Sequence, residues 1–276
     1  MMIDTRPFFR PLAQEFVHVL RRLPRDAWDR PTATGSWTVR DVLAHLVDGT
    51  MRRLSFHRDG ETPPSPRRPI ASERALVEFI NELNREWVAL ARRFSPRLLT
   101  DLYAGASLDL ATFFEGVPLD APALFGVSWA GEAESQGWFD IGREFTEHWH
   151  HQAQIREAVG EPPPSNPEWL RAVLAIAMRG LPHAYRDVPA EEGTMLVVDV
   201  TGACEDSWTL RRESDRWTLA TAPADATPAA RVVASADTLW RLLFNGLNVT
   251  DAEQRVELTG TRALTLPLLR ARSVIV

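Results

Sequence analysis

Apolar residues recur at intervals of three and four along the first two thirds of the chain, and this spacing constrains the fold more than any other feature. Positions with this spacing share one face of a helix, and that face must be buried against another element. Over residues 8–23 they are Phe9, Leu12, Phe16, Val19 and Leu20. The spacing returns over residues 38–54, 72–94, 98–115, 139–159 and 167–180. The sequence therefore predicts an up-and-down four-helix bundle over residues 1–185.

Capping residues and prolines predict where some of these helices begin and end. Thr38 and Asp41 have the spacing of a capping box, in which each side chain binds the backbone N–H of the other residue. The segment Gly60–Pro69 contains four prolines and is predicted to be a surface connection, because proline interrupts helical hydrogen bonding. A long helix from about Phe139 is predicted to end at Gly160.

The pattern changes after about Asp187, where β-branched residues replace the helical spacing. Residues 194–201 (TMLVVDVT) are predicted to form a strand, and residues 208–212 and 216–220 a pair of strands that turn at 213–215. Further elements are predicted at residues 232–233 (strand), after Ser235 (helix), at 256–258 (strand) and at 262–272 (helix). This order indicates a small α+β domain over residues 186–276.

Charge and composition exclude several classes of function. The net charge is −6, which disfavours binding to nucleic acid, and all 31 basic residues are arginine, which excludes Schiff-base chemistry and a phosphate-binding loop lysine. A single cysteine cannot form an internal disulfide or a thiolate zinc site. No apolar run approaches the roughly 18 residues of a membrane span, and the N-terminus lacks the features of a secretory signal. We therefore expect a cytoplasmic monomer or homodimer that acts on a small molecule and binds no membrane.

Three of the seven histidines lie within four residues of one predicted helix, in the sequence EFTEHWHHQAQ over residues 144–154. Residues four apart on a helix lie on the same face, so a carboxylate and an imidazole can act together. Two such pairs are present, Glu144 with His148 and Glu147 with His151. Either pair could supply two ligands to a divalent metal ion.

The residues that follow each pair favour one of them. The line through Glu147 and His151 continues to Ile155 and Ala158, and we expect this apolar line to point inward. The line through the other pair continues to Arg156, which indicates a more solvated face. Glu147 and His151 are therefore the preferred candidates.

A catalytic zinc site usually takes three protein ligands and leaves one position open. His45 is the third candidate, because it lies at the border of the apolar face of the predicted helix that starts at Thr38. In the alternative interpretation, His45 is a histidine at the edge of the core with a backbone partner, and the histidine cluster is a solvated face.

Two segments resemble a known family. The sequence GSWTVRDVLAHL (residues 35–46) and the sequence REFTEHWHHQAQIREAVG (residues 143–160) are similar to the two motifs of the mycothiol-dependent maleylpyruvate isomerase family, within the DinB-like superfamily. Residues 234–243 and 258–261 look like the sterol-carrier-like α+β domain of that family. The resemblance implies a DinB-like four-helix bundle followed by this smaller domain.

The resemblance also implies a set of metal ligands. The first family motif ends in a metal-binding histidine, here His45, and the second has the form E-x-W-x-H-x-x-D. Aligning Trp149 with the family tryptophan implies Glu147 and His151 as the other ligands. The chain departs from the motif at Gln154, where the family commonly has aspartate, so a carboxylate partner for a ligand imidazole is absent.

The chemistry that the resemblance implies is a reaction of a low-molecular-weight thiol, such as mycothiol, assisted by a divalent metal ion, usually zinc. In cis–trans isomerisation the thiolate adds to a double bond, the carbon–carbon bond rotates and the thiolate leaves; thiol S-transfer is related. Cys204 is not expected to supply the sulfur. An anionic substrate or cofactor needs cations, and the nearest candidates are Arg143, Arg156, Arg211 and Arg212.

Two other functions fit the same residues. One is metal-assisted hydrolysis on the same bundle, and the other is a non-enzymatic protein that binds a ligand in an apolar pocket. The ten tryptophans and twelve phenylalanines suit such a pocket and equally suit an ordinary core.

Overall fold

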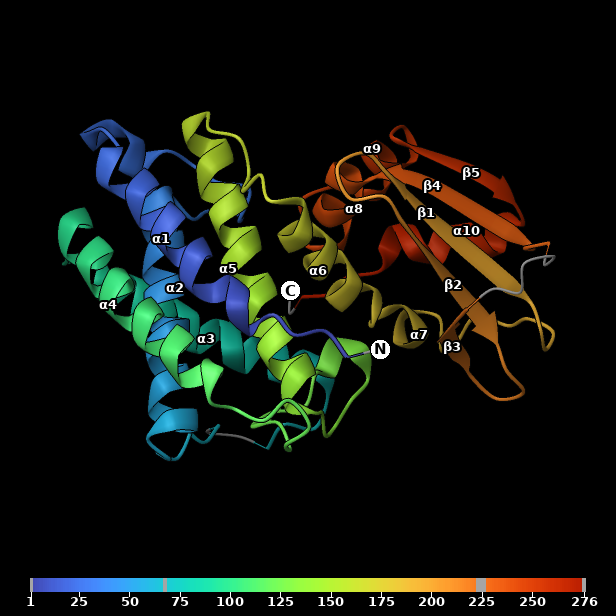
Figure 1. Ribbon diagram of the computed structural model, residues 1–276, viewed down its shortest axis with the longest axis horizontal. Helices are drawn as coiled ribbons and strands as arrows, with labels where there is room; N and C mark the ends of the chain where they lie inside the picture. Colours follow the sequence, from blue (N-terminus) through green and yellow to red (C-terminus); the bar gives the residue numbers. More distant parts are fainter. Residues whose placement is uncertain (1, 67–68, 222–226, 275–276) are drawn as a thin grey trace. The chain divides into compact units, whose positions relative to one another are not determined.

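The computed structural model describes residues 2–66, 69–221 and 227–274, which form two compact units (Figure 1). Residues up to 125 and residues 135–165 form the first unit, and residues 126–134 and those from 166 onwards form the second. The prediction that helices come first and a small sheet follows is confirmed.

The first unit is helical. Its helices are α1 (Arg6–Arg22), α2 (Val39–Arg53), α3 (Glu73–Ala91), α4 (Pro96–Glu115) and α5 (Gly137–Val159), with short turns η1 (Arg25–Asp29) and η2 (Leu54–Arg58). Helices α1, α2, α4 and α5 pack on one another, and α3 packs against α2. Helices α1, α2, α4 and α5 form the predicted four-helix bundle.

The start of α2 is the predicted capping box. The Thr38 side chain accepts a hydrogen bond from the backbone of Asp41, and the Asp41 carboxylate accepts one from the backbone of Thr38. Arg92 also donates to this carboxylate, with both distances 3.0 Å. Behind the cap the apolar face is buried at Val39, Val42, Leu43, Leu46 and Val47, whereas Met51 is exposed. The cap thus fixes where the helix that carries His45 begins.

Helix α5 is buried on almost every side, although polar residues make up much of it. It ends where predicted, at Gly160, whose φ of 79° lies in the left-handed region that glycine tolerates. A helix buried all round brings each of its polar side chains against another part of the bundle. Each of these groups therefore needs a partner.

The second unit contains a five-stranded mixed sheet in the order β3-β2-β1-β4-β5. Its strands are β1 (Met195–Thr201), β2 (Asp206–Arg212), β3 (Trp217–Ala220), β4 (Ala230–Ser235) and β5 (Val256–Gly260). Strands β1 and β4 pair in parallel, with Val198 opposite Val232, and the other pairs are antiparallel. The predicted turn at 213–215 joins β2 to β3.

Helices accompany this sheet. They are α6 (Pro167–Met178), α7 (Leu181–Ala184), α8 (Ala236–Leu243), α9 (Val249–Glu253) and α10 (Arg262–Arg270), with the turn η3 (Ser128–Ala130). Helix α8 packs on β1 and β4, and α10 packs on β4 and β5. By its contacts α6 groups with the sheet, whereas the sequence predicts its residues within the helical domain. The position at which two independently folding domains divide, predicted at 185/186, stays a prediction.

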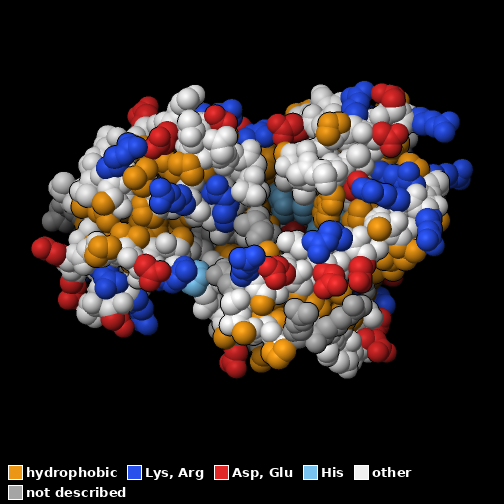
Figure 2. Space-filling view, turned by 180° about the vertical axis from the view of Figure 1, so that it is seen from behind, with side chains coloured by type: hydrophobic (Ala, Val, Ile, Leu, Met, Phe, Trp, Pro, Cys, Tyr) orange, Lys and Arg blue, Asp and Glu red, His pale blue; other side chains and the backbone are white. Residues whose placement is uncertain are grey.

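No helix among the described residues combines the length and the apolar character that crossing a membrane requires. Acidic and basic side chains are interspersed on the face drawn in Figure 2.

Candidate metal centre

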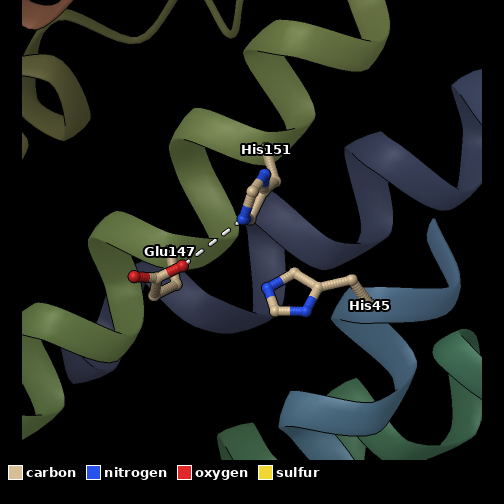
Figure 3. Close-up of side chains that lie close together, drawn as sticks. All are labelled: His45, Glu147 and His151. Carbon is tan, nitrogen blue, oxygen red and sulfur yellow. Dashed lines mark ion pairs between the residues drawn. The ribbon is translucent and has the colours of Figure 1, made fainter. Parts of the chain in front are cut away.

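Two helices of the bundle bring the three predicted ligands together. Helix α5 carries Glu147 and His151 one turn apart, and α2 carries His45 opposite them (Figure 3). One potential ligand atom from each residue lies within 4.8 Å of the other two. Nε2 of His151 lies 3.4 Å from Oε2 of Glu147. The structure therefore brings the three predicted side chains together across the bundle, and that they bind a metal ion stays a prediction.

The charges at this cluster favour metal-binding protonation states. The pKa of His45 is lowered to about 3, first by burial and then by the neighbouring His151, so the imidazole is neutral at pH 7. Burial raises the pKa of Glu147, but its interactions with the imidazoles of His151, His150 and His45 lower it by more, so the net shift is downward. A neutral imidazole and an ionised carboxylate are the forms that bind a metal ion.

The loop that precedes α2 contacts His45 directly and reaches His151 through Gln154. Nδ1 of His151 lies 2.8 Å from Oε1 of Gln154, and the Thr34 hydroxyl donates to that same oxygen across 2.8 Å. The Trp37 ring packs on His45, with ring centroids 5.2 Å apart. One short segment therefore contacts both the α2 and the α5 sides of the cluster.

These residues fit a divalent metal ion by the chemistry of their donors. Two imidazole nitrogens and one carboxylate oxygen are a set that catalytic zinc sites use. With Nδ1 of His151 donating to Gln154, Nε2 of this ring keeps the lone pair that a metal requires. His45, Glu147 and His151 could thus hold one ion and leave a position open.

The second pair on α5 has different surroundings. Arg53 donates to Oε2 of Glu144 across 3.2 Å and forms two hydrogen bonds of 2.8 Å to Asp140. The Tyr103 hydroxyl lies 3.1 Å from Nδ1 of His148. Oε1 of Glu144 lies 3.7 Å from Nε2 of the same ring. These groups are buried, and Arg53 pairs with both carboxylates.

One part of the reason for preferring Glu147 and His151 was therefore wrong, although His151 and Ile155 are buried as expected. The line through Glu144 and His148 is not the solvated one: Gln152 is fully buried and Arg156 is 5% exposed. The Glu147 side chain, by contrast, is 26% exposed. What separates the two pairs is the partner of each carboxylate, an arginine for Glu144 and imidazoles for Glu147.

The four arginines predicted to bind an anion lie in different places. Arg143 lies one turn before Glu147 on α5 and donates to Asp140 across 3.1 Å. Arg156, on the buried line, is paired with Glu15 at 2.6 Å. Arg211 and Arg212 lie on β2 in the other unit. Of these four, only Arg143 and Arg156 share the unit of the metal cluster.

The sequence reasoning missed Arg52, Trp37 and Thr34. Arg52 lies two turns after His45 on α2, and its charge contributes to lowering the His45 pKa. Arg52 forms an ion pair with Asp48 at 2.8 Å. The seven-residue spacing from His45 was a signal for Arg52, whereas the contacts of the loop residues arise only in the folded chain.

Comparison with known proteins places these observations in a family. Residues 9–156, which include all three candidate ligands, match the family model described as the mycothiol maleylpyruvate isomerase N-terminal domain. A protein of Bacillus pumilus (strain SAFR-032), named as a proposed metal-dependent hydrolase, is 28% identical over 108 residues. That match covers 33% of this chain and 60% of the relative, which is less than two thirds of its length.

Two solved structures share the fold. The crystal structure of a histidine-to-alanine variant of the mycothiol-dependent maleylpyruvate isomerase aligns with a TM-score of 0.56 at 14% identity, and covers 92% of this chain and 91% of that one. A second crystal structure of the mycothiol-dependent maleylpyruvate isomerase gives 0.50 at 15% identity, with 86% of each chain covered. At these identities the likeness shows the fold alone.

Proposed function

We propose that this chain, which belongs to the mycothiol maleylpyruvate isomerase family, is a metal-dependent enzyme in which a low-molecular-weight thiol reacts with a small electrophile. The observation that carries the proposal is the meeting of His45, Glu147 and His151 within 4.8 Å. Isomerisation of a maleylpyruvate-type substrate is the leading reaction, and thiol S-transfer is the related one. Zinc is the expected metal, because the donor set is two imidazoles and one carboxylate.

A bound zinc ion would lower the pKa of a thiol and polarise a carbonyl oxygen. The residues of the chain prepare the site for this. His45 is already neutral at pH 7, so no proton competes with the metal there. Glu147 is ionised and compensates part of the metal charge. Trp37 of the loop before α2 packs on His45, and Gln154, bonded to Thr34 of the same loop, holds His151, so few side-chain rotations are lost on binding.

The reacting sulfur is expected to come from outside the chain. Cys204 is the single cysteine, and it is buried. Burial raises the pKa of its thiol, which therefore stays protonated at neutral pH. A protonated, buried thiol is a poor nucleophile, so a free thiol such as mycothiol is the proposed co-substrate.

An assay with and without thiol tests this proposal. Zinc-loaded protein is incubated with unsaturated keto acids and a panel of thiols that includes mycothiol and glutathione. Turnover that requires both zinc and thiol is expected, and it should be lost in Glu147→Gln. Loss of activity in the zinc-free protein without any dependence on thiol contradicts the thiol mechanism.

Metal-assisted hydrolysis is a second candidate, and the name of the Bacillus pumilus relative favours it. The same three residues would hold the metal, but water would replace the thiol. Ester and amide substrates added to the same assay separate the two functions. Hydrolysis that depends on zinc and is indifferent to thiol selects the hydrolase.

A further inference from the structure

Gln154 contacts a ring nitrogen of His151, one of the proposed metal ligands. It lies three residues after His151 on α5, and its Oε1 is 2.8 Å from His151 Nδ1. The Thr34 hydroxyl donates to the same oxygen, also at 2.8 Å. Gln154 is only 6% exposed, so water does not readily replace either partner. Two donors thus converge on one buried amide oxygen.

This arrangement determines which nitrogen of His151 carries the proton. An amide oxygen accepts hydrogen bonds and cannot donate them, so the facing Nδ1 must carry hydrogen. In the neutral ring the lone pair is then on the other nitrogen, Nε2, which lies 3.4 Å from Oε2 of Glu147. In this structure the amide oxygen of Gln154, rather than its nitrogen, faces both the Thr34 hydroxyl and Nδ1 of His151.

Thr34 is itself held in place by its own loop. The Thr32 hydroxyl donates to the carbonyl oxygen of Trp37 across 2.8 Å, and the Trp37 N–H donates to the carbonyl of Thr34 across 3.0 Å. These bonds close the loop between Thr32 and Trp37. The loop then runs directly into Thr38, the cap of the helix that carries His45. Hydrogen bonds within the loop therefore fix the position of Thr34, whose hydroxyl contacts Gln154.

We propose that Gln154, held by Thr34, is a positioning residue for the metal centre: it fixes His151 as the neutral Nδ1–H tautomer and adds no negative charge behind it. A carboxylate at this position would make the imidazole a stronger and more negative donor. The neutral amide leaves more positive charge on the metal. This inference rests on the proposed metal centre and concerns the residues behind it.

Variants at position 154 separate charge, hydrogen bonding and size. Gln154→Leu removes the acceptor at similar volume, and Gln154→Glu keeps an acceptor and adds a charge. Zinc affinity is measured by competition with a chromophoric chelator, and the cobalt-substituted proteins are compared by visible absorption. We expect Gln154→Leu to bind zinc about 10- to 100-fold more weakly than wild type. Gln154→Glu should restore the affinity and shift the cobalt bands.

The loop offers a matched pair of variants. Thr34→Val removes the hydroxyl at constant size and should weaken zinc binding in the same direction as Gln154→Leu. Thr34→Ser keeps the hydroxyl and should bind zinc as wild type does. Circular dichroism of each variant checks that the helical content is retained.

A readout in the metal-free protein makes the inference independent of the proposed function. Nitrogen-15 NMR of the imidazoles distinguishes the two tautomers, and the Nδ1–H form of His151 is expected in wild type and lost in Gln154→Leu. The inference is overturned if His151 has the same tautomer in both proteins, or if Gln154→Leu binds zinc within about twofold of wild type. A wild-type protein that shows the expected tautomer but binds neither zinc nor cobalt contradicts the metal centre instead.

Discussion

Glu144 and Glu147 lie three residues apart on the same helix, and their carboxylates have opposite kinds of partner. Oε2 of Glu144 accepts a hydrogen bond from Arg53 at 3.2 Å, whereas Oε2 of Glu147 lies 3.4 Å from the imidazole of His151. An arginine always carries its charge and compensates a carboxylate permanently. A neutral imidazole does not, so the Glu147 carboxylate remains available to a cation. Helix α5 therefore combines a structural ion pair and a candidate metal ligand within one turn.

The first prediction compares glutamine substitutions at these two positions. Glu147→Gln should weaken zinc binding and reduce turnover while the helical fold is retained, because it removes a ligand charge and little volume. Glu144→Gln should keep zinc affinity and lose about 2 kcal/mol of unfolding free energy, since it removes a charged hydrogen bond to Arg53. Zinc titration and urea unfolding of both variants check this, and zinc loss in Glu144→Gln alone would select the other pair.

The second prediction concerns the buried arginine. Arg53→Met should lower the unfolding free energy by about 3–5 kcal/mol, because it leaves Asp140 and Glu144 buried without their main cation. Arg10→Met serves as the control, since the ion pair of Arg10 with Glu115 is exposed and should cost no more than about 1 kcal/mol. Equal effects in urea unfolding would show that the buried network contributes little.

The third prediction follows the same network with pH. Burial raises the Glu144 pKa, but Arg53 and the neighbouring cationic groups lower it to about 2, below the ordinary value of 4.5. The unfolded chain therefore binds more protons in this range, and the stabilisation by Glu144 is complete above pH 4.5 and lost as the pH falls towards 2. The difference in unfolding free energy between wild type and Glu144→Gln should shrink over that window. A difference that is constant with pH contradicts the shift.

The fourth prediction concerns zinc and thermal stability. A ligand that binds only the folded state stabilises it by about 2.7 kcal/mol at a concentration 100 times its Kd. Zinc should therefore raise the Tm of wild type and of Glu144→Gln, and a chelator should reverse the rise. Glu147→Gln should show little change. An equal rise in all three proteins would place the bound zinc elsewhere.

Much of the fold was predictable because local signals agreed with the tertiary structure. The apolar spacing and the Thr38–Asp41 pattern gave the helices and the start of α2, and the β-branched run at 194–201 gave β1. The grouping of α6 with the sheet could not be predicted, because it depends on contacts between elements rather than on the pattern of either. Periodicity also failed at Met51, whose spacing suits the buried face but whose side chain is exposed.

The sequence pointed to the residues of the candidate site, but part of the argument used to choose them was wrong. Helical spacing brings Glu147 and His151 together, but the same spacing brings Glu144 and His148 together. The polarity of the following residues indicated solvent for the latter pair, whereas Arg53 from another helix allows that line to be buried. A contact made by a residue 91 positions away has no signature in the local sequence. The link from Thr34 to Gln154, 120 positions apart, was hidden for the same reason.

Anomalous X-ray diffraction at the zinc absorption edge, from crystals of zinc-loaded protein, tests the metal centre most directly. The proposed centre predicts one strong peak within bonding distance of a ring nitrogen of His45, a carboxylate oxygen of Glu147 and Nε2 of His151, with a further position open to a small ligand. A peak bound by Glu144 and His148, or zinc-loaded crystals with no peak at these three residues, would contradict it.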